Sequence, residues 1–166
     1  MGVITRMDSI KIKENKLGDT RTATRTPTIS EFEQANRLHY EDVKNMMSEI
    51  ASEIRNRGAM HDYTKLREPN KSLFYRELCA TIEGKMNDFT EGEWYLMHCA
   101  TERHHLNVFC PDDVNLIDVI EMICDCVCAG MARTGEVRPI EIDADILEKA
   151  VQNTVTMLAD AIKIVE

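Results

Sequence analysis

The sequence Met60-His61-Asp62-Tyr63-Thr64-Lys65 joins two segments whose residue patterns predict helices. Gly58, just before it, predicts the end of the long helix upstream. His61 and Asp62 place an imidazole nitrogen and a carboxylate oxygen side by side, and both groups suit Zn, Fe or Mn. The ammonium group of Lys65 suits a phosphate. Because His-Asp pairs also occur by chance, the meaning of this one depends on the other ligand-type residues of the chain.

Helical periodicity extends from this stretch in both directions. Apolar residues recur at intervals of three and four between residues 30 and 57, on one face of a helix that begins at a capping box at Thr28 or Ser30. His39 falls within this apolar stripe and is expected to point inward. Capping signals and periodicity predict helices over residues 30–57, 72–87, 90–105, 115–132 and 143–166. The predicted fold class is therefore all-α.

Two short segments depart from the helical pattern. Isoleucines alternate with polar residues over residues 10–12 and again over residues 140–142, so each segment predicts a short strand, and the two strands could pair. Residues 1–28 are polar and are expected to form an N-terminal segment, followed by one helical domain over residues 29–166.

The segment from residue 115 to 132 predicts a helix buried at the centre of the fold. It begins at Asn115, an N-cap residue, and nearly all its later positions are apolar. The exceptions, Asp118, Glu121 and Asp125, lie within ~60° of arc on one side of the helix. Such a stripe must be solvated, paired with cations or bound to a metal ion. A solvated stripe would have no functional meaning.

The histidines of the chain cluster in sequence. His98, His104 and His105 fall within eight residues, and the two-turn spacing of His98 and His105 places both on one face of the predicted helix. The candidate metal ligands are His39, His61, Asp62, His98, His104, His105 and Asp118. All five histidines belong to this set, so a shared metal site explains them better than five unrelated core positions.

Composition excludes several classes of function. A formal net charge of −9 argues against a general nucleic-acid binder, and no sequence-specific nucleic-acid partner is expected. No apolar run is long enough for a membrane span, so no membrane partner is expected. The six cysteines lie in apolar or helical segments, which predicts reduced thiols in a cytoplasmic protein. Cys124, Cys126 and Cys128 are rotated by ~200° at each step along a helix, so they predict small core residues rather than one metal site.

The charge of the chain is unevenly distributed. Residues 1–27 carry six basic and three acidic side chains, whereas the rest of the chain is acidic. A basic segment beside an acidic body predicts a homo-oligomer in which residues 1–28 pack across subunits. An acidic body is also compatible with a divalent metal ion.

Four motifs carry a resemblance to known proteins: His61-Asp62-x-x-Lys65, Trp94-x-x-x-His98, His104-His105 and Asp118-x-x-Glu121-Met122-x-x-Asp125. The order of a His, the His-Asp pair and a distant Asp resembles the HD-domain superfamily of metal-dependent phosphohydrolases over about residues 30–133. More narrowly, the four motifs resemble an uncharacterised HD-like family of bacteria and phages. The resemblance implies an HD-domain-like helical bundle of about five to six helices. It also implies a phosphodiesterase or nucleotidase that hydrolyses a nucleotide or cyclic nucleotide with metal-activated water.

The resemblance further implies roles for the site residues. Asp62 and Lys65 would carry catalysis, with one or two divalent ions (Mn, Fe, Zn, Ni or Mg) on the candidate ligands. A small-molecule nucleotide would be the substrate, and Lys65 and Arg103 would hold its phosphate. Glu121 and Asp125 would orient the histidines through the ring nitrogens that face away from the metal.

Two differences from the superfamily bear on mechanism. Lys65 stands where the one-metal nucleotidases carry a water-activating Glu, so the base would come from elsewhere or from the metal ion. His98 and His104 are closer in sequence than the matching residues of the two-metal phosphodiesterases, which leaves the number of ions open. Two other functions remain: a non-catalytic protein that keeps the HD fold and binds a nucleotide or a metal, and a purely structural helical domain.

Overall fold

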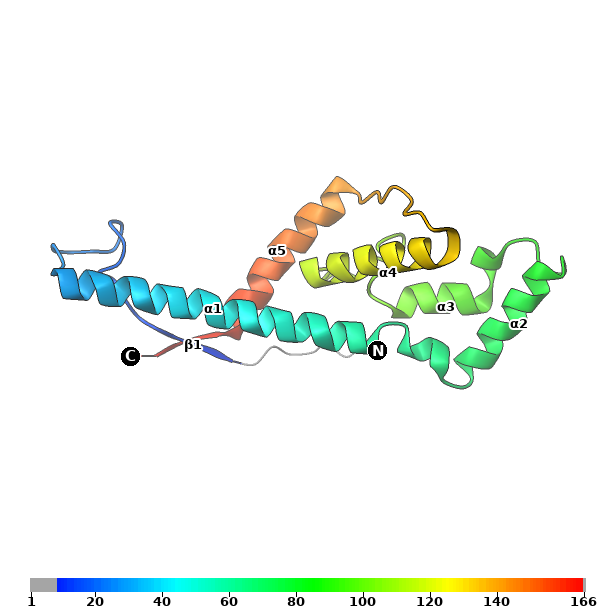
Figure 1. Ribbon diagram of the computed structural model, residues 1–166, viewed down its shortest axis with the longest axis horizontal. Helices are drawn as coiled ribbons and strands as arrows, with labels where there is room; N and C mark the ends of the chain where they lie inside the picture. The colour runs from blue at the N-terminus through cyan, green and yellow to red at the C-terminus, as the bar shows by residue number, and fades with distance from the viewer. Residues whose placement is uncertain (1–8, 166) are drawn as a thin grey trace. The chain divides into compact units, whose positions relative to one another are not determined.

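The computed structural model describes residues 9–165 (Figure 1). It contains five α-helices and one two-stranded sheet, which confirms the predicted all-α class with short strands. The elements are β1 (Ile10–Lys13), α1 (Ile29–Met60), α2 (Asn70–Ile82), α3 (Glu93–Thr101), α4 (Leu116–Thr134), α5 (Ala144–Ala161) and β2 (Ile162–Val165). The first eight residues of the predicted N-terminal segment 1–28 lie outside the described residues. None of the helices described here is long and apolar enough to span a membrane.

The described residues form two compact units. One, called the site unit below, consists of Arg55–Thr154, and the other, the sheet unit, consists of residues 9–54 and 155–165. Helices α1 and α5 contribute residues to both units. The expected boundary between residues 28 and 29 does not coincide with this division.

The sheet pairs the two ends of the described chain. Strands β1 and β2 are parallel, with Ile10 opposite Ile162 and Lys13 opposite Val165. The predicted strand over 10–12 is therefore confirmed, but its predicted partner is wrong, because residues 140–142 form no strand. The predicted last helix also ends early, at Ala161, where β-branched residues alternate with lysine and pair with the similar sequence of β1.

Helix α1 begins as predicted and ends later. Thr28 Oγ1 accepts a hydrogen bond from the Glu31 amide (3.3 Å), and Glu31 Oε2 accepts one from the Thr28 amide (2.8 Å), which forms the expected capping box. At the other end the helix continues past Gly58 to Met60, so the predicted stop at Gly58 is wrong. Asp62 takes the left-handed conformation there, with φ 55°, which Asp tolerates better than most residues.

The predicted inward stripe of α1 is wrong in the sheet unit. His39, Phe32 and Val43 are exposed, whereas Ala35 is buried. Gly18 packs against this position, since a Cβ atom at Gly18 would lie 3.1 Å from the Ala35 Cβ. The small residue Ala35 therefore faces the segment around Gly18, whereas the larger apolar residues Phe32 and Val43 are exposed.

Helix α3 is shorter than predicted. It ends at Thr101, so His104 and His105 lie in the following turn rather than on one helical face with His98. Its start also differs, because the helix is capped by a carboxylate from α2: Glu77 Oε2 accepts a hydrogen bond from the Trp94 amide at 3.0 Å. The predicted helix start at residue 90 is therefore wrong, because α3 begins at Glu93.

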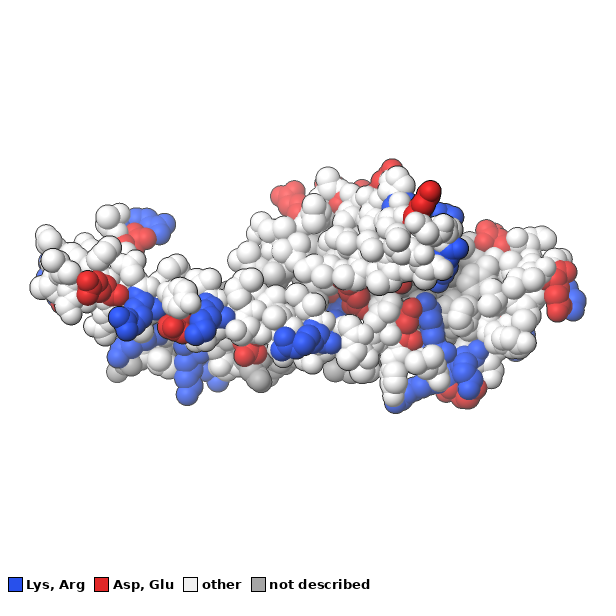
Figure 2. Space-filling model, viewed as in Figure 1, with Lys and Arg blue, Asp and Glu red and all other residues white. Residues whose placement is uncertain are grey.

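The site unit has a small apolar core next to the N-terminal end of α4. Val114, Val119 and Ala150 form its buried centre, with Ile142 among the partly buried residues packed around it. The prediction that α4 is buried throughout is wrong, because only Ile117, Asp118 and Val119 are buried on it. An apolar stripe on the rest of the helix is exposed, and it consists of Ile120, Ile123, Val127 and Met131. Figure 2 shows largely uncharged surface over α4. All six cysteines are free, as expected, but Cys124 and Cys128 are exposed rather than in the core.

We expect Gly130→Ala to lower the free energy of unfolding by about 1–3 kcal/mol. A Cβ atom there would lie 2.7 Å from the Glu136 carbonyl oxygen and 3.3 Å from the Val137 Cα, so the backbone after α4 would have to shift. Gly58→Ala is the matched control, because no atom lies within 4 Å of its Cβ and alanine favours a helix. Urea unfolding should show opposite signs for the two variants, and a stabilised Gly130→Ala would contradict the packing.

Candidate metal site

The first carboxylate of α4 is held by arginines. Asp118 is 0% exposed. It accepts hydrogen bonds from Arg57 Nη2 (2.6 Å) and from Arg103 Nε and Nη2 (2.9 and 2.8 Å). It also completes the predicted cap of α4 by accepting from the Asn115 amide at 2.9 Å. Of the three environments expected for the stripe, pairing with cations is the one that Asp118 has.

Arg103 is committed to carboxylates on every nitrogen of its guanidinium group. Its Nε donates to Asp118, its Nη1 donates to Asp113 Oδ1 at 2.9 Å, and its Nη2 donates to both residues. Its predicted contact with a substrate phosphate stays a prediction, and it would have to compete with these bonds.

Glu121 connects the arginines to the histidines. Its Oε2 accepts from Arg57 Nε and Nη2 at 3.0 and 2.6 Å. Its Oε1 lies 3.1 Å from His61 Nδ1 and 3.4 Å from His104 Nδ1. Burial alone would raise the pKa of Glu121, but the contacts with His104 and His61 and the charge of Arg57 outweigh it and lower the pKa to about 2. An ionised Glu121 can orient the His61 ring through this hydrogen bond, whereas its 3.4 Å contact with His104 Nδ1 is electrostatic and leaves that nitrogen without a hydrogen bond.

Three elements bring the remaining candidates together. His61 and Asp62 follow α1, His98 lies on α3, and His104 and His105 lie in the turn after α3. One ligand atom from each of His98, His104 and His105 lies within 4.8 Å of the others, and the same holds for His61, Asp62 and His104. His104 belongs to both groups, so the two groups form one continuous cluster.

Several buried polar atoms of this cluster lack hydrogen-bond partners among the described residues. Buried atoms without a partner are Asp62 Oδ1, both ring nitrogens of His98 and of His104, and His105 Nε2. Asp62 Oδ1 lies 3.3 Å from His98 Nε2 and 3.9 Å from His104 Nε2. Buried polar atoms are almost always paired, because an unpaired one costs about 1–3 kcal/mol. A metal ion would satisfy several of these atoms at once, so this group of His and Asp side chains could hold one.

The electrostatics of the cluster favour neutral imidazoles at His98 and His105. Burial, aided by the charge of Lys65, lowers the pKa of His98 to about 3. Burial and the neighbouring His104 lower the pKa of His105 to about 4. Burial also acts to lower the pKa of His61, but its contact with Glu121 and the charges of Asp62 and Asp125 raise it overall. Neutral His98 and His105 keep the lone pairs that a metal ion requires.

We expect the metal-free protein to lose stability as the pH falls from about 6.5 to 4. The folded-state pKa values of His98 and His105 are lowered, so the unfolded chain takes up protons in this window that the folded chain does not. The raised pKa of His61 acts in the opposite sense, adding stability below about pH 6.5. His105→Gln should flatten the acid loss relative to wild type in urea unfolding of chelator-treated protein. An unchanged slope would show that His105 titrates normally.

Aromatic stacking and one lysine complete the cluster. The Trp94 ring stacks on His98 at 4.8 Å and on Phe74 at 4.0 Å between ring centroids. Lys65 Nζ forms an ion pair with Asp62 Oδ2 and lies 5.7 Å from the centroid of the Trp94 ring. Lys65 is therefore held beside the cluster by Asp62, and its predicted contact with a substrate phosphate stays a prediction.

Two of the predicted ligands do not join either group. Asp118 is engaged by arginines, as described above. His39 lies in the sheet unit, where it lines a pocket of about 480 Å³ with Ile12, Asp42 and Ile164. The ligand roles of His39 and Asp118 stay predictions. Asp125 is close to the cluster, since its Oδ1 lies 3.5 Å from His61 Nε2.

Arg57 is a site residue that the sequence analysis did not name. It donates to both Asp118 and Glu121. The available signal was its position in the last turn of the predicted helix, four residues before His61.

Comparison with known proteins gives a family without an activity. No curated protein and no solved structure matches the chain. The model of the DUF5662 family, described as a family of unknown function, matches residues 28–164, which include every candidate residue of the cluster. The match does not link the chain to the HD-domain superfamily, so that resemblance stays a prediction. The chain belongs to the DUF5662 family.

Proposed function

We propose that this protein is a metal-dependent phosphohydrolase that acts on a nucleotide or cyclic nucleotide. The observation that supports the proposal best is the cluster of buried, unpaired ligand atoms on Asp62, His98, His104 and His105. A purely structural histidine cluster would be expected to pair its ring nitrogens with protein groups. The resemblance of the four motifs to HD-like proteins supplies the reaction class.

The chain's own residues would divide the work as follows. Asp62 and the histidines would hold one or two ions, and Glu121 would fix the orientation of His61 and His104 through their Nδ1 atoms. Lys65 would exchange part of its ion pair with Asp62 for a phosphoryl oxygen. A divalent ion supplies activation of water near pH 7 and neutralises charge on the phosphoryl oxygens. A site with more nitrogen than oxygen ligands favours Zn, Fe or Ni over Mg.

The direct test is metal analysis of purified protein together with a hydrolysis screen. The panel contains nucleoside mono-, di- and triphosphates, cyclic nucleotides and cyclic dinucleotides, each with and without added Mn. Hydrolysis of at least one compound that stops on chelation supports the proposal. Protein that binds no metal at all contradicts it.

We expect Lys65→Gln to raise KM by about tenfold while leaving the metal content unchanged, because a charge-assisted contact with phosphate is lost. Lys71→Gln is the matched control, since Lys71 is exposed and pairs only with Glu68 at 2.9 Å among the described residues. Steady-state kinetics with the best substrate of the screen gives the comparison. A fall in metal content for Lys65→Gln would mean that Lys65 supports the metal ligands instead.

The second candidate is a non-catalytic protein that binds a metal or a nucleotide. The pairing of Arg57, Arg103 and Lys65 with carboxylates favours it, because no cation of the cluster is free for phosphate among the described residues. Tight nucleotide binding in calorimetry without turnover on the panel would select this candidate.

We also propose that the protein is a cytoplasmic homo-oligomer. Its six free cysteines fit a reducing compartment. The exposed apolar stripe on α4, defined above by four residues, is a surface that a second copy could cover. A monomer in sedimentation at micromolar concentration would exclude the oligomer.

A further inference from the structure

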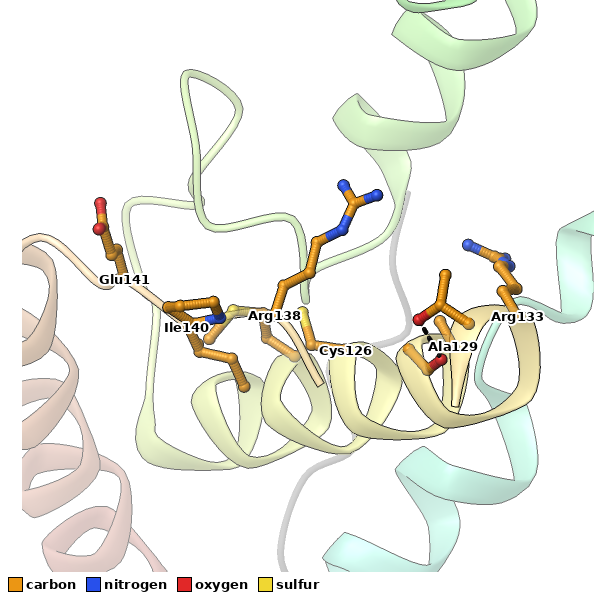
Figure 3. A pocket seen from close by; sticks show the side chains of 10 residues that line it. Cys126, Ala129, Arg133, Arg138, Ile140 and Glu141 are labelled. Atoms are coloured by element: carbon orange, nitrogen blue, oxygen red, sulfur yellow. Dashed lines mark hydrogen bonds between the residues drawn. The ribbon is translucent and has the colours of Figure 1, made fainter. Parts of the chain in front are cut away.

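The site unit contains a pocket on a side of α4 that does not face the histidine cluster. It has a volume of about 410 Å³ and is formed by α4 and the extended segment after it, residues 138–141 (Figure 3). This volume is in the range of small-molecule sites. Its apolar lining comes from Met122, Cys126, Ala129, Pro139 and Ile140. On α4, Met122 and Cys126 follow Glu121 and Asp125 by one residue, so they are rotated by ~100° from these carboxylates.

Two arginines of this pocket have no assigned partner. Arg133 and Arg138 line it, and neither side chain has an ion pair or hydrogen bond with the rest of residues 9–165. Arg57 and Arg103, in the same unit, are both paired with carboxylates. Both arginines are exposed, and Arg133 also lies in the last turn of α4, where the helix dipole favours a cation.

The wall of the pocket is held in place by the turn after α4. Gly135 has φ 77°, and its amide donates to the Met131 carbonyl at 3.2 Å. Thr134 Oγ1 donates to the Gly130 carbonyl oxygen at 3.0 Å and to the Glu136 carbonyl oxygen at 3.1 Å. Gly130 has no Cβ, so Glu136 can approach the helix closely. The segment that carries Arg138 is therefore positioned before any ligand arrives.

We propose that this pocket binds a small molecule with an apolar body and one phosphate or carboxylate group. The apolar lining would cover the body, and the guanidinium groups of Arg133 and Arg138 would bind the anionic group. Figure 3 shows both arginines extending to the same side of α4, with Glu141 at the opposite end of the pocket. The carboxylate of Glu141 repels an anion, so the charged group of the ligand lies at the arginine end. The site is separate from the proposed active site and does not depend on its chemistry.

Four probe compounds test the apolar and the anionic parts of the proposed ligand separately: hexyl phosphate, hexanoate, hexanol and inorganic phosphate. Each is titrated into the full chain, with the methyl NMR signals of Ile140, Met122 and Ala129 as the readout. Hexyl phosphate, hexanoate or both should shift these signals at concentrations at least ten times lower than hexanol or inorganic phosphate do. If hexanol binds equally well, the pocket recognises only the apolar part of the ligand. If inorganic phosphate alone has an effect, the pocket is a simple anion site. Either result overturns the proposal.

Charge-removing variants then test which side chains of the pocket bind the anionic group. Arg133→Gln with Arg138→Gln should weaken binding of the preferred anion at least tenfold, whereas Arg76→Gln, an exposed arginine of α2, should leave it unchanged. Glu141→Gln should strengthen it about twofold, because a repelling carboxylate is removed. Unchanged affinity in the double arginine variant, whose fold is checked by the same methyl spectrum, overturns the proposal. Metal content and turnover should stay the same in all of these variants.

Discussion

Asp118→Ala should lower the free energy of unfolding by about 3–5 kcal/mol, the range measured when one partner of a buried ion pair is removed. The carboxylate is 0% exposed and accepts from two arginines and from the Asn115 amide. Without it, Arg57 and Arg103 keep their charge in a half-buried place, and α4 loses half of its capping box. Urea unfolding of chelator-treated protein measures the effect.

Two controls separate this role from that of a metal ligand. Asp112→Ala removes a fully exposed carboxylate paired with Lys149 at 3.3 Å, and it should change stability by less than about 1 kcal/mol. Adding saturating metal should stabilise wild type and Asp118→Ala by the same amount. If metal stabilises only the wild type, Asp118 is a ligand, as the sequence analysis predicted.

The sequence predicted those features that depend on local chemistry. The capping boxes at Thr28 and Asn115 define the starts of α1 and α4, because a side-chain oxygen beside the first turn is sufficient to fix them. The strand over residues 10–12 could be predicted from its alternation alone. Its partner could not, because the isoleucines at 140–142 and 162–164 carry similar patterns, and packing around Val114 takes Ile142 into the core.

Ends and faces of helices were harder to predict. The end of α1 depends on Asp62 adopting φ 55° rather than on Gly58, and no local pattern distinguishes the two. His104 and His105 approach His98 through a turn after Thr101, although the spacing suggested one helical face. The residues of the cluster were nevertheless named, because residue type rather than helix position identified them.

Helical periodicity predicted that the three carboxylates of α4 lie on one side of the helix, but it could not predict their partners. Their spacing predicted that Asp118, Glu121 and Asp125 share one environment, but in the structure each has different neighbours. Asp118 contacts two arginines, Glu121 contacts an arginine and two histidines, and Asp125 lies near His61. Which cation meets which carboxylate depends on Arg57 and Arg103 from other segments, and their positions are tertiary information. His39 was included for its place in the apolar stripe and for the order of a His, the His-Asp pair and a distant Asp, and it is exposed in the other unit.

Asp62→Asn should reduce turnover by about a thousandfold, a loss of several kcal/mol of transition-state stabilisation, and should reduce metal content. Asn is the suitable replacement because it tolerates the left-handed conformation of Asp62, whereas Ala at φ 55° would add backbone strain. The amide keeps the size of the side chain and removes the charge that faces His98, His104 and Lys65. The fold should survive, since Asp62 is only half-buried and caps no helix through its side chain.

Two further variants, Glu121→Gln and Asp112→Asn, give reference values for the effect of Asp62→Asn on metal binding and turnover. Glu121 acts through His61 and His104, so its loss should weaken metal affinity by about 10–100-fold, and the exposed Asp112 should have no effect. Metal content, melting temperature and turnover are measured for all three variants. Full metal content and wild-type turnover in Asp62→Asn would remove the proposed site. Loss of metal in Asp62→Asn from a wild type that hydrolyses nothing on the panel would keep the metal site and select the non-catalytic protein, because Asp62 would then hold an ion that no substrate meets.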